Sequence, residues 1–334
     1  MSTVEPGVPS LARAGRGRRV AIIALTCATA VWGWSYLATV WLLPEMGTAS
    51  LVAVRFLAAG SLMVAFRPRA IVALGRRHFL AGLALAFFLG TGTMLQVEGQ
   101  HHIAASQSGF LTSLFVVLTP LVARLLFKAE VARGVWGAVV AAMAGLTVIS
   151  FNGVSFGLGA WLTLAAALCY SVQMALLSAF SSADRVYGLA SLQILGSGVI
   201  ATVWALPAGV DLPDTAPGWG WLTYSTLLAT LGMYAVQTWA QSRVPAATAA
   251  VVMACEPLFV AAFSLLVGIP LTTRTVVGGL LVLVAMYLVI TSDRRAVPLH
   301  ADSLAAPGAP PSAGATAHDP TRPARPGTTP GVRE

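Results

Sequence analysis

An acidic residue next to a proline, Glu256-Pro257, lies near the middle of an apolar stretch that spans residues 246–268. A carboxylate at mid-membrane depth is costly to place, so such a residue usually marks a substrate or ion pathway. Burial favours the protonated carboxyl, which suits proton binding or the neutralisation of a cationic solute. Pro257 leaves a carbonyl one turn upstream without its helical partner and predicts a helix break. A hydrogen bond that only fixes helix packing is the alternative role for Glu256.

Other ionisable residues lie in or beside the apolar stretches. Arg55 lies about two turns into its stretch, and we expect its side chain to extend to the lipid headgroups; pairing with Glu98 or with an anionic solute is the alternative. Glu98 and His101 have the Glu-x-x-His spacing of a di-metal carboxylate site, but such a site needs two of these motifs and the sequence has one. We therefore expect no metal here. A solvated loop or a pH-sensitive gate is the prediction for His101 and His102.

Aromatic, hydroxyl and amide side chains recur within the apolar stretches. A polar stripe on a membrane helix must avoid lipid, so it faces protein or a water-filled pathway. One such stripe, at helical spacing, contains Thr230, Tyr234, Gln237 and Gln241. Besides Glu256, Arg55 and Glu98, the residues predicted to line a substrate or ion pathway are Trp32, Ser35, Tyr36, Gln96, Tyr170, Gln173, Tyr234 and Gln237.

The composition indicates what must position these residues. Of the 334 residues, 57% are hydrophobic and 10% are charged, which is typical of a polytopic membrane protein. Ten apolar stretches each approach the ~20 residues that a membrane-spanning helix needs. Their limits are 20–43, 49–66, 79–97, 106–127, 134–151, 157–179, 188–206, 219–241, 246–268 and 275–291. We therefore predict an all-α polytopic membrane protein with ten transmembrane helices.

The basic residues predict how the chain lies in the membrane. With a cytoplasmic N-terminus, one set of loops holds nearly all of them, and the opposite loops hold Arg274 beside Glu45, Asp211 and Asp214. Such a bias orients a membrane protein, so both termini are predicted to be cytoplasmic. Residues 1–19 form a basic cytoplasmic segment, and residues 293–334, rich in proline and alanine, a disordered cytoplasmic tail. The net charge of +8 is spread over loops rather than gathered in a patch, so no nucleic-acid partner is expected.

Two halves of the chain resemble each other. Residues 20–151 and 157–291 each contain five apolar stretches, and the fourth of each half carries a proline, Pro120 or Pro257, where we predict a structural helix break. Because five is an odd number, the second half must enter the membrane upside down relative to the first. Inverted repeats of this kind are typical of secondary transporters, which bind substrate near the midplane between the repeats.

At this level of detail the chain resembles the EamA-type members of the drug/metabolite transporter superfamily. The resemblance rests on VWGWS at 31–35, VRFLAA at 54–59, residues 106–120, Ala129-Glu130 with Gly137, and Glu256-Pro257. It covers residues 20–291. The second half has Gly268-Ile269 where the family often has Gly-Glu, so Glu130 has no acidic counterpart there. The resemblance implies a metabolite carrier, often an exporter, with a central cavity lined by both halves.

We therefore predict a secondary active transporter, an exporter of a small metabolite, an amino acid-like compound or a drug across the bacterial inner membrane. Its expected partners are the small-molecule substrate, a coupled proton and the lipid bilayer, as a monomer or homodimer and without a cofactor. A membrane-embedded enzyme is the first alternative, but the ten stretches contain no Asp and no G-x-S-x-G motif. A flippase-like carrier of a lipid intermediate through the same cavity is another. A channel or an ATP-driven pump lacks its expected signature in this sequence.

Overall fold

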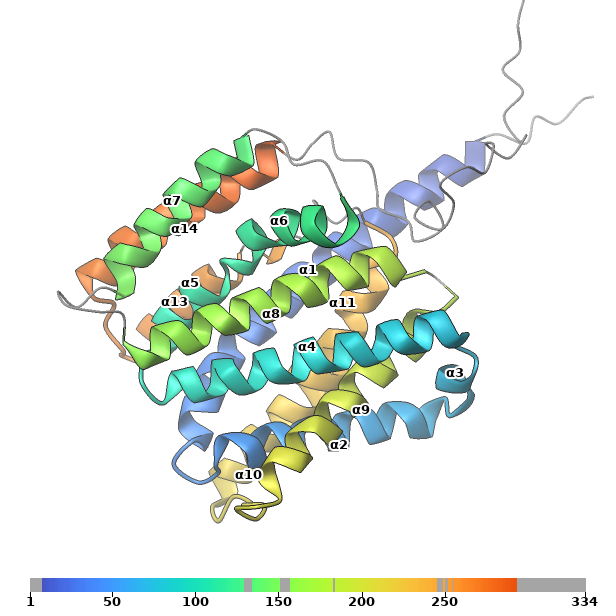
Figure 1. The fold of residues 1–334 in the computed structure, drawn as a ribbon, viewed down its shortest axis with the longest axis horizontal. Helices are drawn as coiled ribbons and strands as arrows, with labels where there is room; N and C mark the ends of the chain where they lie inside the picture. The colour runs from blue at the N-terminus through green and yellow to red at the C-terminus, as the bar shows by residue number, and fades with distance from the viewer. Residues whose placement is uncertain are drawn as a thin grey trace, which may run out of the picture.

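The computed structural model describes residues 8–128, 134–150, 157–182, 184–244, 249, 252–253 and 255–292. Within these residues the chain is helical and contains no β-strand (Figure 1). Six of the described helical segments are long and apolar enough to cross a membrane, beginning with Arg19–Leu42 and ending with Val186–Ala205. The predicted tail at 293–334 and the Ala129-Glu130 pair lie outside the described residues.

Among the described residues, seven helices precede the gap that ends at residue 156. They are α1 (Val8–Leu42), α2 (Thr48–Phe66), α3 (Arg69–Val72), α4 (Arg76–Gln100), α5 (Ala105–Thr112), α6 (Phe115–Phe127) and α7 (Gly134–Ser150). The later part comprises α8 (Leu158–Phe180), α9 (Val186–Ala205), α10 (Ala216–Thr223), the π-helical segment η1 (Tyr224–Gly232), α11 (Met233–Gln241), α13 (Glu256–Leu266) and α14 (Thr273–Ser292).

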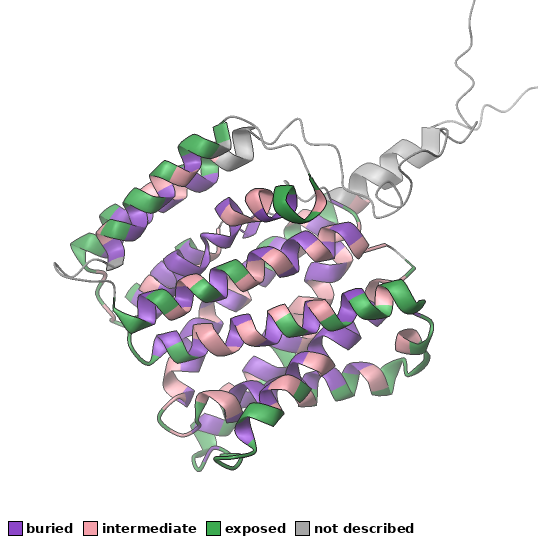
Figure 2. Cartoon of the chain, in the orientation of Figure 1, coloured by how far each residue is buried: buried purple, intermediate pink, exposed green. Residues whose placement is uncertain are grey.

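The helices pack side by side with their buried faces inward (Figure 2). The most extensive pairs are α7 with α14, α2 with α9, and α4 with both α8 and α9; α1 packs on α13 and α11, and α6 packs on α8. The outward faces carry large apolar side chains, among them Leu125, Val140 and Trp204, which are more than half exposed. An apolar exterior of this kind suits a protein surrounded by lipid.

Glycines allow the closest helix pairs to approach. A Cβ added to Gly60 on α2 would lie 2.5 Å from the Cα of Leu195 on α9, and one added to Gly198 on α9 would lie 2.5 Å from the backbone nitrogen of Leu57 on α2. On the α7–α14 pair, a Cβ at Gly145 would lie 2.8 Å from the carbonyl oxygen of Gly278. Small residues let membrane helices pack backbone to backbone, because lipid supplies no hydrophobic force to hold them together.

Four boundaries differ from those predicted. α1 begins at Val8 rather than at residue 20, so described residues before 20 continue the helix instead of forming a separate segment. The predicted helix at 106–127 consists of α5 and α6, and the break lies at Ser113-Leu114 rather than at Pro120, which is inside α6. Because Pro120 has no N–H, it cannot bond to the carbonyl of Val116, four residues earlier in the same helix.

The other two differences concern the second half. The predicted helix at 219–241 is divided into α10, η1 and α11, with a wider π-helical middle. α13 begins at Glu256, so this residue lies in a first helical turn rather than in the middle of a helix. Pro257 occupies the next position, where its missing N–H needs no helical partner. The predicted break at Pro257 is therefore present in the structure as the start of α13.

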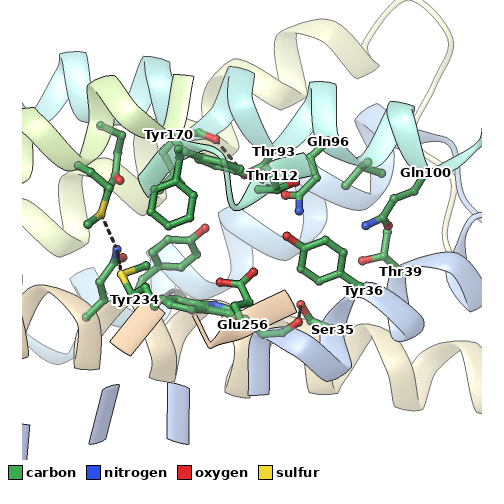
Figure 3. Close-up of a pocket in the computed structure, with 18 of the residues that line it drawn as sticks. Ser35, Tyr36, Thr39, Thr93, Gln96, Gln100, Thr112, Tyr170, Tyr234 and Glu256 are labelled. Carbon is green, nitrogen blue, oxygen red and sulfur yellow. Dashed lines mark hydrogen bonds between the residues drawn. The ribbon is translucent and has the colours of Figure 1, made fainter. Parts of the chain in front are cut away.

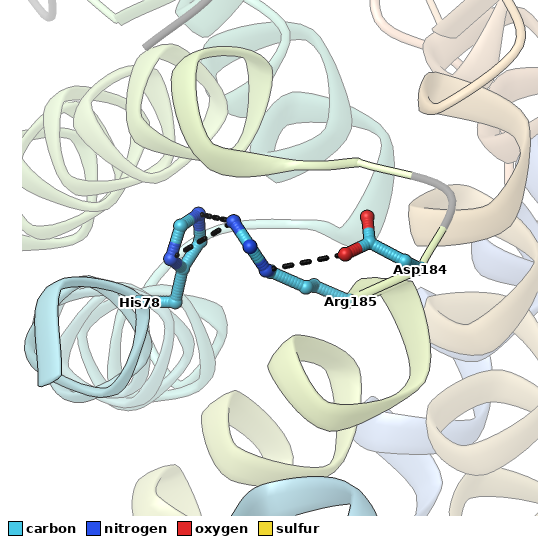
Figure 4. A network of polar contacts seen from close by, with 3 residues as sticks. All are labelled: His78, Asp184 and Arg185. Carbon is cyan, nitrogen blue, oxygen red and sulfur yellow. Dashed lines mark hydrogen bonds and ion pairs between the residues drawn. The ribbon is translucent and has the colours of Figure 1, made fainter. Parts of the chain in front are cut away.

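One end of the bundle is tied by a contact between α4 and the connection that leads into α9. The Nη1 atom of Arg185 lies 2.9 Å from Nε2 of His78, and its Nε atom lies 3.3 Å from a carboxylate oxygen of Asp184 (Figure 4). The His78 ring also packs edge-on against Phe180 at the end of α8. These contacts link the starts of α4 and α9 with the end of α8.

Candidate functional site

A cavity lies inside the bundle, between α1, α2, α4, α5, α6, α8, α11 and α13 (Figure 3). The volume in it that the centre of a water molecule can occupy is about 70 Å³. A single water needs about 10–15 Å³ by this measure, so the cavity has room for roughly five waters or one small solute. The lining residues are Trp32, Ser35, Tyr36, Thr39, Arg55, Leu89, Thr93, Gln96, Val97, Gln100, Thr112, Phe115, Tyr170, Gln173, Met174, Tyr234, Gln237, Met253 and Glu256.

Glu256 brings a carboxylate to one side of this cavity. It is the first residue of α13, where the helix dipole favours a negative charge. Gly33 on α1 allows α13 to come close, because any residue with a Cβ at that position would place it 2.7 Å from Cβ of Phe259. The hydroxyl of Tyr36 faces the carboxylate across the cavity (Figure 3). Arg185 and Asp184 form the one ion pair among the described residues, so Glu256 has no cationic partner there.

Arg55 brings a positive charge into the same cavity. Its side chain is only 6% exposed, its Nε donates a hydrogen bond to the hydroxyl of Thr230, and its guanidinium lies 5.5 Å from the centre of the Phe56 ring. The prediction that Arg55 extends to the headgroups is therefore wrong, and so is its pairing with Glu98. The side chain points inward because η1 offers the Thr230 hydroxyl there, which sequence spacing alone does not indicate.

The segment η1 is held to the first helices by side-chain hydrogen bonds. Trp32 donates from Nε1 to the carbonyl oxygen of Ala229 at 2.8 Å, and Tyr224 donates its hydroxyl to the carbonyl oxygen of Val31 at 2.7 Å. The Thr230 hydroxyl donates to the carbonyl of Ser225, five residues earlier, at 2.8 Å. Within a membrane every backbone carbonyl must be satisfied inside the protein. These bonds stabilise a π-helical segment, a form often found at functional sites.

Amide and hydroxyl groups line the wall opposite Glu256. The Tyr170 hydroxyl lies 2.6 Å from Oε1 of Gln96, to which it donates, and 3.2 Å from the Thr93 hydroxyl. Gln173 donates to Oε1 of Gln193 at 3.1 Å, which extends the polar contacts from the cavity to α9. These bonds orient the cavity-facing amides, because Gln96 accepts through its Oε1 and Gln173 donates through its Nε2.

Some polar atoms at the cavity have no partner. Gln237 is 2% exposed, and its Nε2 donates to the sulfur of Met174 at 3.3 Å, while its Oε1 receives no hydrogen bond from the described residues. The Oε1 of Gln100 and the hydroxyl of Thr112 are likewise unpartnered. A buried acceptor without a donor costs free energy, so each of these atoms is a place where water or a solute can donate.

The structure brings most of the predicted pathway residues onto this one cavity. These are Glu256, Arg55, Trp32, Ser35, Tyr36, Gln96, Tyr170, Gln173, Tyr234 and Gln237. Glu98 is not among them: its carboxylate accepts a 2.6 Å hydrogen bond from the Thr48 hydroxyl at an exposed position. Glu98 follows Gln96 by two residues, which on a helix places it on another face. The part that the lining residues play in transport stays a prediction.

The sequence analysis missed several lining residues, and three of them left a signal. Thr93 and Gln100 lie three residues before and four residues after Gln96, so all three share one face of α4. Thr39 likewise follows Ser35 by four residues on α1. The apolar lining residues Leu89, Val97, Phe115, Met174 and Met253 have no such signal, because they resemble any other core residue.

Comparison with known proteins assigns a family. The model of the EamA-like transporter family matches the chain twice, at residues 19–151 and 157–291. A protein of Archaeoglobus fulgidus described as an uncharacterized transporter is 25% identical over 277 residues, which is 82% of this chain and 87% of the relative. A solved crystal structure has a TM-score of 0.60 and 13% sequence identity, and the match covers 83% of this chain and 98% of the other. The last likeness concerns the fold alone.

Proposed function

The chain belongs to the EamA-like transporter family, and we propose that it is a secondary carrier that moves a small solute across the membrane through the cavity around Glu256. One observation carries the proposal. The cavity is lined from both of the matched segments, by Tyr36 and Arg55 of the first and by Tyr234 and Glu256 of the second. A site between two halves can open to either side of the membrane as the halves rock against each other.

We further propose ten transmembrane helices arranged as two inverted five-helix repeats. The helix pairs support this arrangement, because α2 packs on α9 and α7 on α14, which joins equivalent helices of the two segments. In addition, α1 packs on α13 while α8 packs on α6, so the first helix of each segment contacts the fourth of the other. This reciprocal contact between first and fourth helices is expected for repeats related by a pseudo-two-fold axis in the membrane plane.

In this proposal the carrier lies in the inner (plasma) membrane with both termini in the cytoplasm, and it exports its solute. The arginine-rich loops, which include the one between α2 and α4, support this orientation. Glu256 is the proposed site of a coupled proton, since its carboxyl group lines the cavity and has no cationic partner among the described residues. The neutral form is favoured when no cation is present, and the charged form when one is.

The test compares metabolite concentrations inside and outside cells that contain the protein, cells that lack it, and cells with the Glu256→Gln variant. The proposal predicts at least one small solute that the protein depletes from the cells and that accumulates outside. Purified protein in liposomes should then move that solute with a saturable, ionophore-sensitive rate, which separates a carrier from a channel. Identical metabolite profiles in all three strains under conditions of good expression would contradict the proposal.

A further inference from the structure

Four arginines lie where the chain turns between α2 and α4. They are Arg67, Arg69, Arg76 and Arg77. Residues 46–97 contain no Asp or Glu that could neutralise them. The apolar span of α2 ends at Phe66, and the next one begins at Arg76. The turn therefore lies at the level where the hydrocarbon of a bilayer meets the headgroups, and it presents positive charge there.

The turn has a fixed shape, because α3 lies between the end of α2 and the start of α4 and packs on α9 (Figure 1). A Cβ added to Gly188 on α9 would overlap the carbonyl oxygen of Ala70, so glycine is needed for this close approach. Leu74, at the end of the turn, is buried in one cluster with Leu189 and Leu192 of α9. A surface that is already ordered loses little conformational entropy when it binds a partner.

Aromatic rings of α8 and α9 position two of the arginines. The guanidinium carbon of Arg67 lies 5.4 Å from the centre of the Tyr187 ring, and that of Arg77 lies 5.5 Å from the centre of the Phe180 ring. Tyr187 is itself held in place, since its hydroxyl donates to the carbonyl oxygen of Met63 at 2.7 Å. A guanidinium that lies over a ring keeps the N–H groups at its edge available to an anion.

The positive charge of the turn is not neutralised by the neighbouring helices. Arg67, Arg69 and Arg76 are exposed, and among the described residues no ion pair joins them to a carboxylate. Asp184, in the connection that leads into α9, is paired with Arg185 (Figure 4). An anionic partner from outside the protein would therefore meet an excess of positive charge here.

Apolar side chains flank the arginines. Phe66 and Val72 are 77% and 84% exposed, and Leu80 in the second turn of α4 is 53% exposed. Large apolar side chains that are this exposed mark an interaction site, and beside basic residues they are typical of protein surfaces that lie at the membrane interface. The partner that fits this turn thus combines a negative headgroup with hydrocarbon chains.

We propose that residues 66–80 bind an anionic phospholipid of the surrounding leaflet. The arginines hold its phosphate, and Phe66, Val72 and Leu80 contact its acyl chains. Arginine suits a phosphate because its planar guanidinium donates two parallel hydrogen bonds. A zwitterionic lipid is disfavoured, because the cation of its headgroup is repelled by arginines that no carboxylate neutralises. The inference concerns the lipid around the protein and is independent of the solute that the cavity carries.

The test compares two short-chain lipids on the purified, delipidated full-length protein in a non-ionic detergent. Dioctanoyl phosphatidylglycerol is anionic, and dioctanoyl phosphatidylcholine has the same acyl chains but is zwitterionic. Native mass spectrometry measures the bound fraction over a range of lipid concentrations. Phosphatidylglycerol should bind more tightly by about tenfold or more, since each arginine near a membrane surface strengthens the binding of anionic lipid about fivefold.

A pair of double variants assigns the site. Arg69→Gln with Arg76→Gln removes two exposed side chains of the turn and should weaken the binding of phosphatidylglycerol by about tenfold or more, with little change for phosphatidylcholine. Arg124→Gln with Arg243→Gln is the matched control. It also removes two exposed arginines, one from α6 and one that follows α11, and both lie outside the turn. The control should keep the full preference for phosphatidylglycerol.

Equal binding of the two lipids by the unaltered protein would overturn the proposal. An equal loss in both double variants would also overturn it, because phosphatidylglycerol would then respond only to overall charge. Inorganic phosphate at the concentration of the lipid should not displace phosphatidylglycerol; displacement would assign the arginines to a free phosphate instead of a lipid. If the Arg69/Arg76 variant does not fold, the comparison of the two lipids on the unaltered protein remains decisive.

Discussion

Replacement of Thr230 by valine probes how the cavity holds its positive charge. The Thr230 side chain is fully buried in η1, accepts the hydrogen bond from Arg55 Nε and donates to the carbonyl of Ser225. Valine keeps the branched shape but has no acceptor, so the guanidinium of Arg55 loses its hydrogen-bond partner among the described residues. A hydrogen bond to a charged group contributes about 1.5–3 kcal/mol, and the lost donor to Ser225 adds about 1 kcal/mol. We expect Thr230→Val to lower the free energy of unfolding by about 2.5–4 kcal/mol.

The assay is the apparent melting temperature of the purified protein in one detergent at one scan rate. Thr202→Val on α9 is the matched control, since its hydroxyl donates 2.8 Å to the carbonyl of Gly198 in the same helix and to no charged group. A loss of about 1 kcal/mol or less is expected there. Equal shifts in melting temperature for Thr230→Val and Thr202→Val would refute the reasoning, because they would show that Arg55 does not depend on the η1 hydroxyl.

Three other changes have defined outcomes. Gly60→Ala should lower stability by about 1–3 kcal/mol, because its Cβ would lie 2.5 Å from the backbone of α9, whereas Gly137→Ala, with nothing within 4 Å, should leave the melting temperature unchanged or raised. Trp32→Phe leaves the carbonyl of Ala229 without its 2.8 Å donor and should cost about 1–3 kcal/mol by the same melting assay; an unchanged temperature would contradict this. Glu98→Gln should leave the transport rate in liposomes within about twofold of the unaltered protein, because Glu98 lies outside the cavity; a tenfold loss would contradict the placement.

Family, helical fold and membrane character could be predicted from the sequence. Apolar stretches near the length of the bilayer core, separated by prolines and charges, are a strong signal because the lipid allows few alternatives to a helix. Motifs such as VWGWS at 31–35 and Glu256-Pro257 led to the family, and the match of the EamA-like transporter model confirms it.

Polar residues in apolar stretches also predicted much of the cavity lining. Tyr234 and Gln237 share a helical stripe, and both reach the cavity from α11. The reason is physical: a polar side chain in a membrane helix cannot face lipid, so it turns to the protein interior. The same logic, applied along α4, would have added Thr93 and Gln100.

Local backbone geometry was not predictable in the same way. The break before α6 lies at Ser113-Leu114, which carries no proline or glycine, and the π-helical form of η1 follows from tertiary bonds made by Trp32 and Arg55. The position of Arg55 along its helix was likewise not enough to predict the direction of its side chain. Its distance from the end of α2 permits extension to the headgroups, yet a hydroxyl on another helix decides its direction.

The central claim, that solute passes through the cavity around Glu256 and Arg55, is tested most directly by transport in liposomes. The solute found by the metabolite comparison is supplied on one side, and its uptake is followed at several pH values. If the solute passes through this cavity, Glu256→Gln removes the pH dependence of the rate and Arg55→Gln abolishes transport, while Thr202→Val transports normally. Unchanged rate and unchanged pH dependence in Glu256→Gln, together with normal transport by Arg55→Gln, would contradict it.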